Sequence, residues 1–290
     1  MAGNADRKEA RKKEAQKHLG LVKGLFATET ARTIEGAVLY EDGEGRDLPI
    51  PEARFETTQV SVEWEDGAHA AAKAKGKVCL LDPASYTKPG GNYLSGSWSP
   101  EEQLCAESNL FCILEGLKES YYDENRQSTH GGLFSDRALY LADVMFTTGG
   151  AMKKRDVLVV APPNRRFALE NHRSEAECDL DLANRVKAVM TIAAANEVDA
   201  LVLCAFGCGF FGNADAQVAG LFKAWLDEHP GVFEQVVFAI PGGPALDVFR
   251  DVFDAHEAAP AVFEEVPDDD EDEDDWLPET DEDGRWTFGG

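Results

Sequence analysis

The chain has 290 residues, of which 43% are hydrophobic, and its formal net charge at pH 7 is −26. This apolar content is enough for a sizeable core, and the length fits one large domain with short additions. No apolar run approaches the roughly 18 residues that a membrane-spanning helix needs. The charged N-terminal segment has no apolar stretch behind it, unlike a secretory signal. We therefore expect a soluble cytoplasmic protein with no membrane partner.

The negative charge is concentrated near the C-terminus. Fourteen of the 54 acidic residues lie between Glu264 and Asp283, and we predict that residues 259–290 form a disordered acidic tail. The rest of the chain still carries a net charge of about −13, which repels a phosphate backbone. Direct binding to nucleic acid is therefore not expected. A small phosphorylated ligand remains compatible with this charge, because backbone amides can hold a phosphate without basic side chains.

The cysteines and histidines show no metal-binding pattern. None of the six cysteines forms a C-x-x-C pair, and four lie in apolar runs where Cys behaves as a small hydrophobe. The six histidines also lack the spacing of metal ligands. We expect reduced thiols, no metal site and no cofactor.

The sequence first predicts helices and then alternating strands and helices. Residues 1–35 are rich in Ala, Lys, Arg and Glu, and predict an extension of one or two helices with a solvated basic face. Short β-type segments follow, chiefly within residues 53–64. Buried-strand patterns then occur at residues 77–81, 156–161, 200–205 and 236–240. Helical patterns lie between and after them, at residues 99–117, 186–193, 218–225 and 246–253.

Buried strands that alternate with helices predict a three-layer α/β/α fold around a mixed, largely parallel sheet. We assign this macrodomain-like domain to residues 36–258, between the helical extension and the acidic tail. Sheets of this kind bind ligands at the carboxyl ends of their strands. Two glycine-rich loops follow predicted strand ends here, and both are candidate binding loops.

The loop after the strand at 200–205 is a candidate phosphate-binding loop. Three glycines in six positions let the backbone approach a ligand closely and turn its N–H groups inward. A helix follows, and its N-terminus favours an anion. The two phenylalanines could offer an aromatic face to a ribose or adenine, or could instead fill the core of a tight turn. The candidate residues are Gly207, Cys208, Gly209, Phe210, Phe211, Gly212 and Asn213.

The loop after the strand at 77–81 leads to a pair of glutamates, Glu101 and Glu102. Two interpretations of Glu102 are open. With Ser99 at the N-cap and Pro100 at the first helical position, Glu102 completes a capping box. Alternatively, it faces the cleft beside the first loop and donates a proton. Asp82, at the strand end, could bond an adenine amino group or a ribose hydroxyl, or cap a turn.

Together the two loops resemble those of the microbial-type poly(ADP-ribose) glycohydrolases, whose catalytic part is a macrodomain. The family's Gly-Gly-Gly loop is matched by Gly90, Gly91 and Asn92, and its Gln-Glu-Glu followed by Leu-Cys is matched by residues 100–105. Residues 207–213 look like the family's Gly-Cys-Gly-x-Phe-Gly-Asn segment. The resemblance extends over roughly residues 10–255, including Ala-Asp-Val at 142–144, where Asp143 is a weaker candidate.

The resemblance implies hydrolysis of the O-glycosidic ribose–ribose bond of poly(ADP-ribose), or of a related ADP-ribosyl linkage, with release of ADP-ribose. Glu102 aligns with the catalytic glutamate, which acts as acid and then base. Glu101 would bond ribose hydroxyls, residues 90–92 would surround the reacting ribose, and residues 207–212 would hold the diphosphate, with Phe211 against the ligand. The substrate could be carried on ADP-ribosylated proteins.

Three positions depart from the family pattern. Asn92 replaces the third glycine, Pro100 replaces the glutamine before the glutamates, and Asp82 stands where the family commonly has Asn. We expect Asn92 to tolerate a left-handed backbone better than most residues. The departures leave a second hypothesis open, in which the domain binds ADP-ribose or a derivative as a signal without catalysis. A structural domain whose Glu102 only caps a helix is a third.

Overall fold

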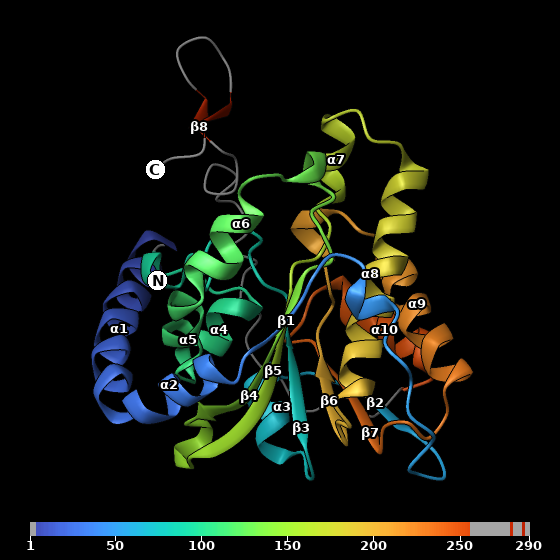
Figure 1. Ribbon diagram of the computed structural model, residues 1–290, viewed down its shortest axis with the longest axis horizontal. Coiled ribbons are helices and arrows are strands. Elements are labelled where there is room, and N and C mark those ends of the chain that lie inside the picture. The colour runs from blue at the N-terminus through green and yellow to red at the C-terminus, as the bar shows by residue number, and fades with distance from the viewer. Residues whose placement is uncertain (1–3, 256–278, 281–285, 288–290) are drawn as a thin grey trace.

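A seven-stranded sheet forms the centre of the protein in its computed structural model, which describes residues 4–255, 279–280 and 286–287 (Figure 1). The strand order is β1-β4-β5-β3-β6-β7-β2, with β3 central. Strands β5, β3, β6, β7 and β2 run parallel, whereas β4 and β1 are antiparallel to their neighbours. The mixed, largely parallel sheet predicted from the sequence is therefore confirmed. The strands are β1 (Val38–Tyr40), β2 (Gln59–Glu63), β3 (Val78–Asp82), β4 (Ala138–Phe146), β5 (Lys153–Val160), β6 (Ala200–Leu203) and β7 (Gln235–Ala239).

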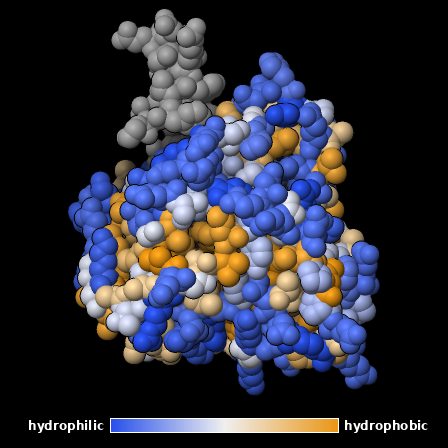
Figure 2. All heavy atoms as spheres, viewed as in Figure 1, coloured by the Kyte–Doolittle hydropathy of each residue, from blue (hydrophilic) through white to orange (hydrophobic). Residues whose placement is uncertain are grey.

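Helices cover both faces of the sheet and complete the three layers. One face packs against α8 (Glu175–Ala195), α9 (Asp215–Glu228) and α10 (Pro244–Phe253). The other packs against α3 (Gly67–Lys73), α4 (Pro100–Ala106) and α5 (Leu110–Gly116), and α1 (Asn4–Leu25) packs on the outside of α5. Both faces need a cover because the strands carry apolar side chains on both sides. In β3, Val78 and Leu80 point into one layer, and Cys79 and Leu81 point into the other. Figure 2 shows a mostly hydrophilic outer face with apolar side chains gathered near its centre.

Shorter elements connect these layers. They are α2 (Ala27–Glu35), η1 (Glu44–Arg46), η2 (Tyr93–Ser95), the π-helical turn η3 (Lys118–Tyr122), α6 (Asp123–Asn125), η4 (His130–Gly132), η5 (Thr148–Gly150), α7 (Arg165–Glu170) and η6 (Gly209–Phe211).

The helix predicted over residues 99–117 is divided into α4 and α5. The break occurs at Ser108 and Asn109, which pair with the end of β4 instead of continuing the helix. Ser108 forms an isolated bridge with Phe146, and the Asn109 N–H donates to the Met145 carbonyl at 3.1 Å. The Asn109 side chain accepts the Met145 N–H in return, at 2.9 Å. A contact with a residue 36 positions away therefore overrides the local helical pattern.

Strand β4 is an element that the sequence patterns did not indicate. Its pairing with β5 shifts register between Leu141 and Val144, and Asp143 at this bulge has a φ of +62°. The Asp143 N–H donates to Asp156 at 3.1 Å, and its exposed carboxylate lies 2.7 Å from Lys154. Asp143 thus lies near the start of β5, away from the carboxyl ends of the parallel strands, and is not part of the candidate site.

The N-terminal helices pack against the rest of the protein. Ala15 and Val22 of α1 are buried, while Lys12, Lys13 and Lys17 are exposed, so the prediction of a solvated basic face is confirmed. Helix α2 contacts β4 and α5, and the Thr33 hydroxyl of α2 donates to the Ala142 carbonyl at 3.0 Å. The division of the chain at residues 35 and 258 stays a prediction.

Three further sequence expectations concern the chain as a whole. None of the helices that the structure describes is long and apolar enough to cross a membrane. All six cysteines lie in the described part of the chain and are free thiols. The acidic tail predicted for residues 259–290 lies outside the described residues, apart from a short ladder between β8 (Glu279–Thr280) and β9 (Trp286–Thr287).

Candidate active site

The two candidate loops leave neighbouring strands at the same edge of the sheet. The first, residues 83–99, follows β3, and the second, residues 204–214, follows β6, which pairs with β3 in parallel. A third loop, residues 161–164, follows β5 on the other side of β3. The Asn213 amide donates to the Pro163 carbonyl at 2.9 Å and joins the second loop to the third. The sheet topology therefore brings together the segments that the sequence placed far apart.

Two glycines of the first loop lie against the side chains around them. Gly90 and Gly91 have φ values of +63° and +55°, in the left-handed region that favours glycine. A Cβ on Gly90 would lie 2.6 Å from the Phe111 ring. A Cβ on Gly91 would collide with Glu102 Oε1 and would lie 2.8 Å from Glu101 Oε2. Glycine is required here because the backbone approaches both glutamates.

Glu102 combines the two roles that the sequence left open. It is 1% exposed and lies at the third position of α4. Its Oε2 accepts the Ser99 N–H at 3.1 Å and a bond from the Ser99 hydroxyl, which is the predicted capping box. Its Oε1 accepts the Asn92 N–H at 2.8 Å. One oxygen therefore anchors the side chain to the helix start, and the other faces the glycine loop.

Glu101 is buried beside Glu102 and has one oxygen available. Its Oε2 accepts the Ser85 N–H at 2.7 Å, whereas its Oε1 is buried without a hydrogen-bond partner. Burial raises the pKa of Glu101 well above its ordinary value, and Asp82 and Glu102 add to this effect. The backbone N–H groups of Ser85 and Gly90 act in the opposite direction. A buried acceptor without a partner is a position where a ligand donor can bond.

Asp82 lies at the carboxyl end of β3 and is 0% exposed. Neither of its carboxyl oxygens has a hydrogen-bond partner. Burial raises the pKa of Asp82 well above its ordinary value, and Glu102 adds to this effect. Within the described residues, no hydrogen bond or ion pair joins Asp82, Glu101 or Glu102 to a basic side chain. The three carboxyl groups thus form a buried acidic cluster below the first loop.

The second loop has the backbone geometry that the glycine pattern indicates. Gly207, Gly209 and Gly212 have φ values of +70°, +65° and +75°. Asn213 holds the loop closed, because its buried amide donates to the Gly207 carbonyl at 2.8 Å as well as to Pro163. A Cβ on Gly209 would meet no atom within 4 Å, so this glycine borders open space.

The phenylalanines of the second loop do not fill the core. Phe210 and Phe211 are half-buried, with ring centroids 6.1 Å apart, whereas the preceding Phe206 is fully buried. The Arg166 guanidinium lies 4.9 Å from the centre of the Phe210 ring. Cys208 packs against the core, and burial raises the pKa of its thiol. The aromatic side chains are therefore placed at the loop surface, beside a cation.

Comparison with known proteins agrees with this geometry. Residues 16–148 match the family model of the microbial-type PARG catalytic domain. The poly(ADP-ribose) glycohydrolase (PARG) of Thermomonospora curvata has a similar structure, with a TM-score of 0.75 and 29% sequence identity over 84% of this chain and 100% of that chain. A single-residue mutant of the Deinococcus radiodurans enzyme, in complex with ADP-ribose, has a TM-score of 0.70 and 30% identity over 77% of this chain and 96% of that chain.

The chain belongs to the microbial-type PARG family. A second structure of the T. curvata enzyme is bound to the inhibitor ADP-HPD, and matches with a TM-score of 0.73 and 29% identity over 84% of this chain and 99% of that chain. No curated protein matches the sequence.

Two of the three departures from the PARG pattern, Asn92 and Pro100, fit the structure without strain. Asn92 has a φ of −105°, so the left-handed tolerance expected of it is not used. Its side-chain oxygen lies 3.5 Å from the Lys88 ammonium, at the exposed rim of the loop. Pro100 is the first residue of α4, where its missing N–H costs no helical hydrogen bond. Neither substitution displaces the two glutamates.

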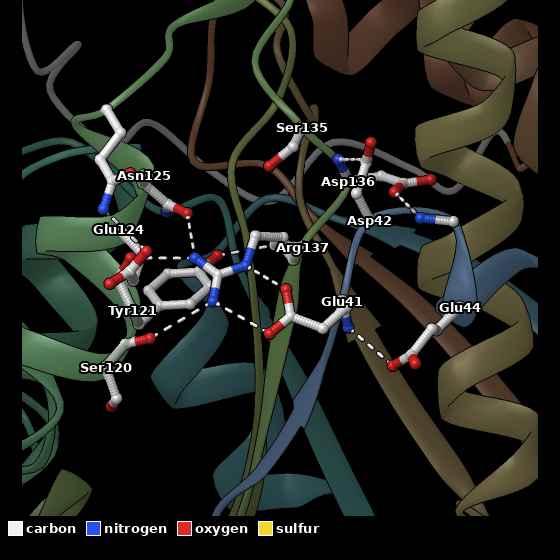
Figure 3. A network of polar contacts seen from close by, with 12 residues as sticks. Glu41, Asp42, Glu44, Ser120, Tyr121, Glu124, Asn125, Ser135, Asp136 and Arg137 are labelled. Carbon is white, nitrogen blue, oxygen red and sulfur yellow. Dashed lines mark hydrogen bonds and ion pairs between the residues drawn. The ribbon is translucent and has the colours of Figure 1, made fainter.

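A polar network behind the first loop was not foreseen from the sequence. The Asn125 amide donates to the Tyr86 carbonyl in the loop at 2.9 Å, and its oxygen accepts from Arg137 at 2.8 Å. Figure 3 shows Arg137 between Glu41 and the backbone of Ser120 and Tyr121. Its partners come from segments up to 96 residues away, so no local pattern could have revealed the network.

A small pocket of about 20 Å³ opens beside α4. It lies at the carboxyl ends of β3 and β6, and its lining is mainly apolar. Within the described residues, no group of three or more His, Cys, Asp or Glu side chains is arranged to hold a metal ion. The residues that line the pocket are Gly67, Leu80, Leu81, Pro100, Leu104, Val202, Leu203 and Cys204.

Proposed function

We propose that this protein hydrolyses the O-glycosidic ribose–ribose bond of poly(ADP-ribose), or a related ADP-ribosyl linkage, and releases ADP-ribose. The family membership supports the reaction class. The observation that carries the proposal is the buried Glu101–Glu102 pair, held in the first turn of α4 with its carboxylates directly against Gly91. A site that only bound ADP-ribose would not need a second buried carboxyl group at this point.

We assign the acid–base role to Glu102. Its Oε2 is bonded to Ser99, so Oε1, on the side of Gly91 and Asn92, is the oxygen available to the reacting ribose. The protonated carboxyl would transfer its proton to the leaving ribose oxygen as positive charge develops on the other sugar. The resulting carboxylate would then take a proton from the attacking water. Asn92 orients Oε1 through its N–H group.

We assign substrate positioning to Glu101. Its Oε1 lacks a partner in a buried site, and a ribose hydroxyl would supply the missing donor. The backbone of Gly90, Gly91 and Asn92 would surround the same ribose, since no side chain at the two glycines blocks the approach. Asp82 would contribute from the end of β3. Its protonated carboxyl group would donate a hydrogen bond to an acceptor atom of the ligand, or to the carboxyl group of Glu101 or Glu102.

We assign the diphosphate to the second loop. The positive φ values of Gly207, Gly209 and Gly212 let the loop turn backbone N–H groups toward one anion, although the Gly212 N–H itself donates to the Gly209 carbonyl at 2.9 Å. Phe210 and Phe211 lie at the loop surface, where an adenine or ribose face can contact them. Arg166 beside Phe210 supplies positive charge to this side of the site. The first loop would therefore hold the reacting ribose and the second the diphosphate.

The substrate would be ADP-ribose polymer, free or attached to ADP-ribosylated proteins, and no nucleic acid is expected to bind directly. The six free thiols support a cytoplasmic location. No cofactor enters the proposed reaction, because the carboxyl groups supply the proton transfers.

The test compares the wild type with Glu102→Gln by calorimetric titration of ADP-ribose and by polymer turnover on the same samples. Gln at this position still completes the capping box, so the variant removes the acid and keeps the helix start. We expect both proteins to bind ADP-ribose and the variant to lose roughly 10²–10⁴-fold in turnover. Glu107→Gln, at the C-cap of the same helix, is the matched control and should keep activity.

The outcomes separate the hypotheses. If both proteins bind ADP-ribose and neither cleaves polymer, the domain is a reader or acts on another linkage. If neither binds, the proposed assignment of both loops is wrong. If Glu102→Gln cleaves polymer at the wild-type rate, another residue is the acid.

A further inference from the structure

Helix α1 lies directly over the segment that connects the glycine loop to the catalytic helix. Gly96, in this segment, is buried and has a φ of +88°. A Cβ on Gly96 would collide with the Lys8 carbonyl and would lie 3.0 Å from the Lys12 backbone nitrogen. The Arg11 guanidinium lies 5.2 Å from the centre of the Trp98 ring. The backbone of α1 therefore touches the loop just before α4 begins.

Tyr93 makes the most specific contact between the loop and α1. It follows Asn92 directly, and its side chain is only 3% exposed. Its hydroxyl donates to the Ala15 carbonyl at 3.3 Å and lies 2.7 Å from His18 Nδ1. Its ring also packs against Phe111, with centroids 5.4 Å apart. Tyr93 is thus held from both sides, by α1 and by α5.

The hydrogen-bond pattern favours the His18 tautomer that carries its hydrogen on Nδ1. The Ala15 carbonyl can only accept, so the Tyr93 hydroxyl hydrogen points to it. The same hydroxyl must then accept from His18, so Nδ1 carries a hydrogen. Nε2 is buried without a partner, and a second hydrogen there would be an unsatisfied donor. Burial accordingly lowers the pKa of His18, which favours the neutral ring.

These contacts influence the position of the Glu102 carboxyl group through the peptide unit that joins Asn92 to Tyr93. Asn92 donates its N–H to Glu102 Oε1 at 2.8 Å, and Tyr93 is the next residue in the chain. A shift of the Tyr93 backbone therefore moves the donor that orients Oε1. Proton transfer is sensitive to such shifts, because small misplacements of reacting groups cost large factors in rate.

We propose that α1 positions the catalytic loop, with Tyr93 as the positioning residue and His18 and Ala15 as its partners on the helix. The inference rests on the proposed glycohydrolase function and assigns a role in it to the N-terminal extension. Tyr93 acts on turnover through Asn92 and Glu102, and it does not contact the substrate.

The first experiment compares full-length wild type with Tyr93→Phe, which removes the hydroxyl and keeps the ring. We expect kcat for polymer to fall roughly three- to tenfold, with KM and the ADP-ribose Kd nearly unchanged. Tyr140→Phe is the matched control: Tyr140 is also 3% exposed, and its hydroxyl donates to the Asp156 carboxylate of β5, away from the loop. Both variants should lower Tm, but only Tyr93→Phe should lower kcat.

Two substitutions of His18 test its role as the hydrogen-bond partner of the Tyr93 hydroxyl. Asn can place an amide N–H where His18 carries Nδ1–H, whereas Ala cannot. We therefore expect His18→Asn to keep most of the activity and His18→Ala to reproduce the loss in kcat. In the double variant with Tyr93→Phe, the two losses should not multiply, because both remove the same contact.

A backbone substitution gives an independent test. Gly96→Ala introduces a Cβ that α1 must move to accommodate, while Gly149→Ala adds a Cβ at a φ of +64° with no atom within 4 Å. Both carry the strain of a left-handed alanine, but only Gly96→Ala should lower kcat. Wild-type kcat in both Tyr93→Phe and Gly96→Ala would overturn the inference. A wild type that releases no ADP-ribose in this assay would instead refute the proposed function, and the inference with it.

Discussion

Replacing Asp82 by Asn should make the stability of this protein less sensitive to pH. Asp82 is fully buried at the end of β3, and neither of its oxygens has a hydrogen-bond partner. The substitution keeps the shape of the side chain and removes its titration. Because burial and Glu102 raise the pKa of Asp82 in the folded protein, the wild type and the variant should diverge as pH rises.

The sign and size follow from proton binding. Well below the ordinary Asp pKa of about 3.9 the carboxyl group is protonated in both the folded and the unfolded chain, so it contributes no pH dependence. As pH rises, the unfolded chain releases this proton while the folded protein keeps it. The free energy of unfolding of the wild type then falls by about 1.4 kcal/mol per pH unit for this group, until the raised pKa is passed.

The assay is urea unfolding of both proteins at several pH values between 4 and 8. The buried amide adds a constant to the difference, so the slope against pH is the informative quantity. Thr191→Val is the control: Thr191 is fully buried and its hydroxyl has no partner, but it does not titrate. Its difference from the wild type should be independent of pH. A pH-independent difference for Asp82→Asn as well would show that Asp82 does not bind a proton on folding, and would refute the reasoning.

The remaining predictions concern the two loops. Gly91→Ala should lower the free energy of unfolding by roughly 2–4 kcal/mol, from left-handed strain and overpacking against Glu101 and Glu102, and should abolish turnover; wild-type stability in urea would contradict this. Asn213→Ala should cost roughly 1–3 kcal/mol of stability, because two buried carbonyls lose their donor, and calorimetry should show weaker ADP-ribose binding. Phe211→Ala should weaken ADP-ribose binding by roughly 1–3 kcal/mol with kcat retained; an unchanged Kd would remove Phe211 from the ligand contacts.

The sequence predicted best the parts of the fold that are buried on both faces. Strands β3, β6 and β7 and the second half of β5 are short, nearly continuous apolar runs, which is the pattern of a central parallel strand. Strand β4 escaped prediction because its bulge at Asp143 interrupts the apolar pattern. The division between α4 and α5 depends on Asn109 pairing with Met145 in β4. Both features depend on partners that only the folded chain brings near.

The same distinction holds at the candidate site. The glycines of both loops were evident because their spacing is local, and the structure gives them the left-handed conformations that only glycine adopts readily. The role of Asn213 was not evident, since the sequence suggested a ligand contact and the structure shows an amide that closes its own loop. His18 and Tyr93 are 75 positions apart, so their contact had no sequence signal.

In the structure, the two interpretations of Glu102, as a helix cap and as an acid, are compatible. A capping glutamate and a catalytic glutamate make different demands, but a carboxyl group has two oxygens. The cap uses Oε2, bonded to Ser99, and this bond fixes the side-chain rotamer at the start of α4. Fixing Oε2 leaves Oε1 at a defined place against Gly91 and Asn92, which is what proton transfer to a bound ribose requires. The capping box is therefore the support of the proposed acid, and a Ser99→Ala variant should lose turnover as well as stability.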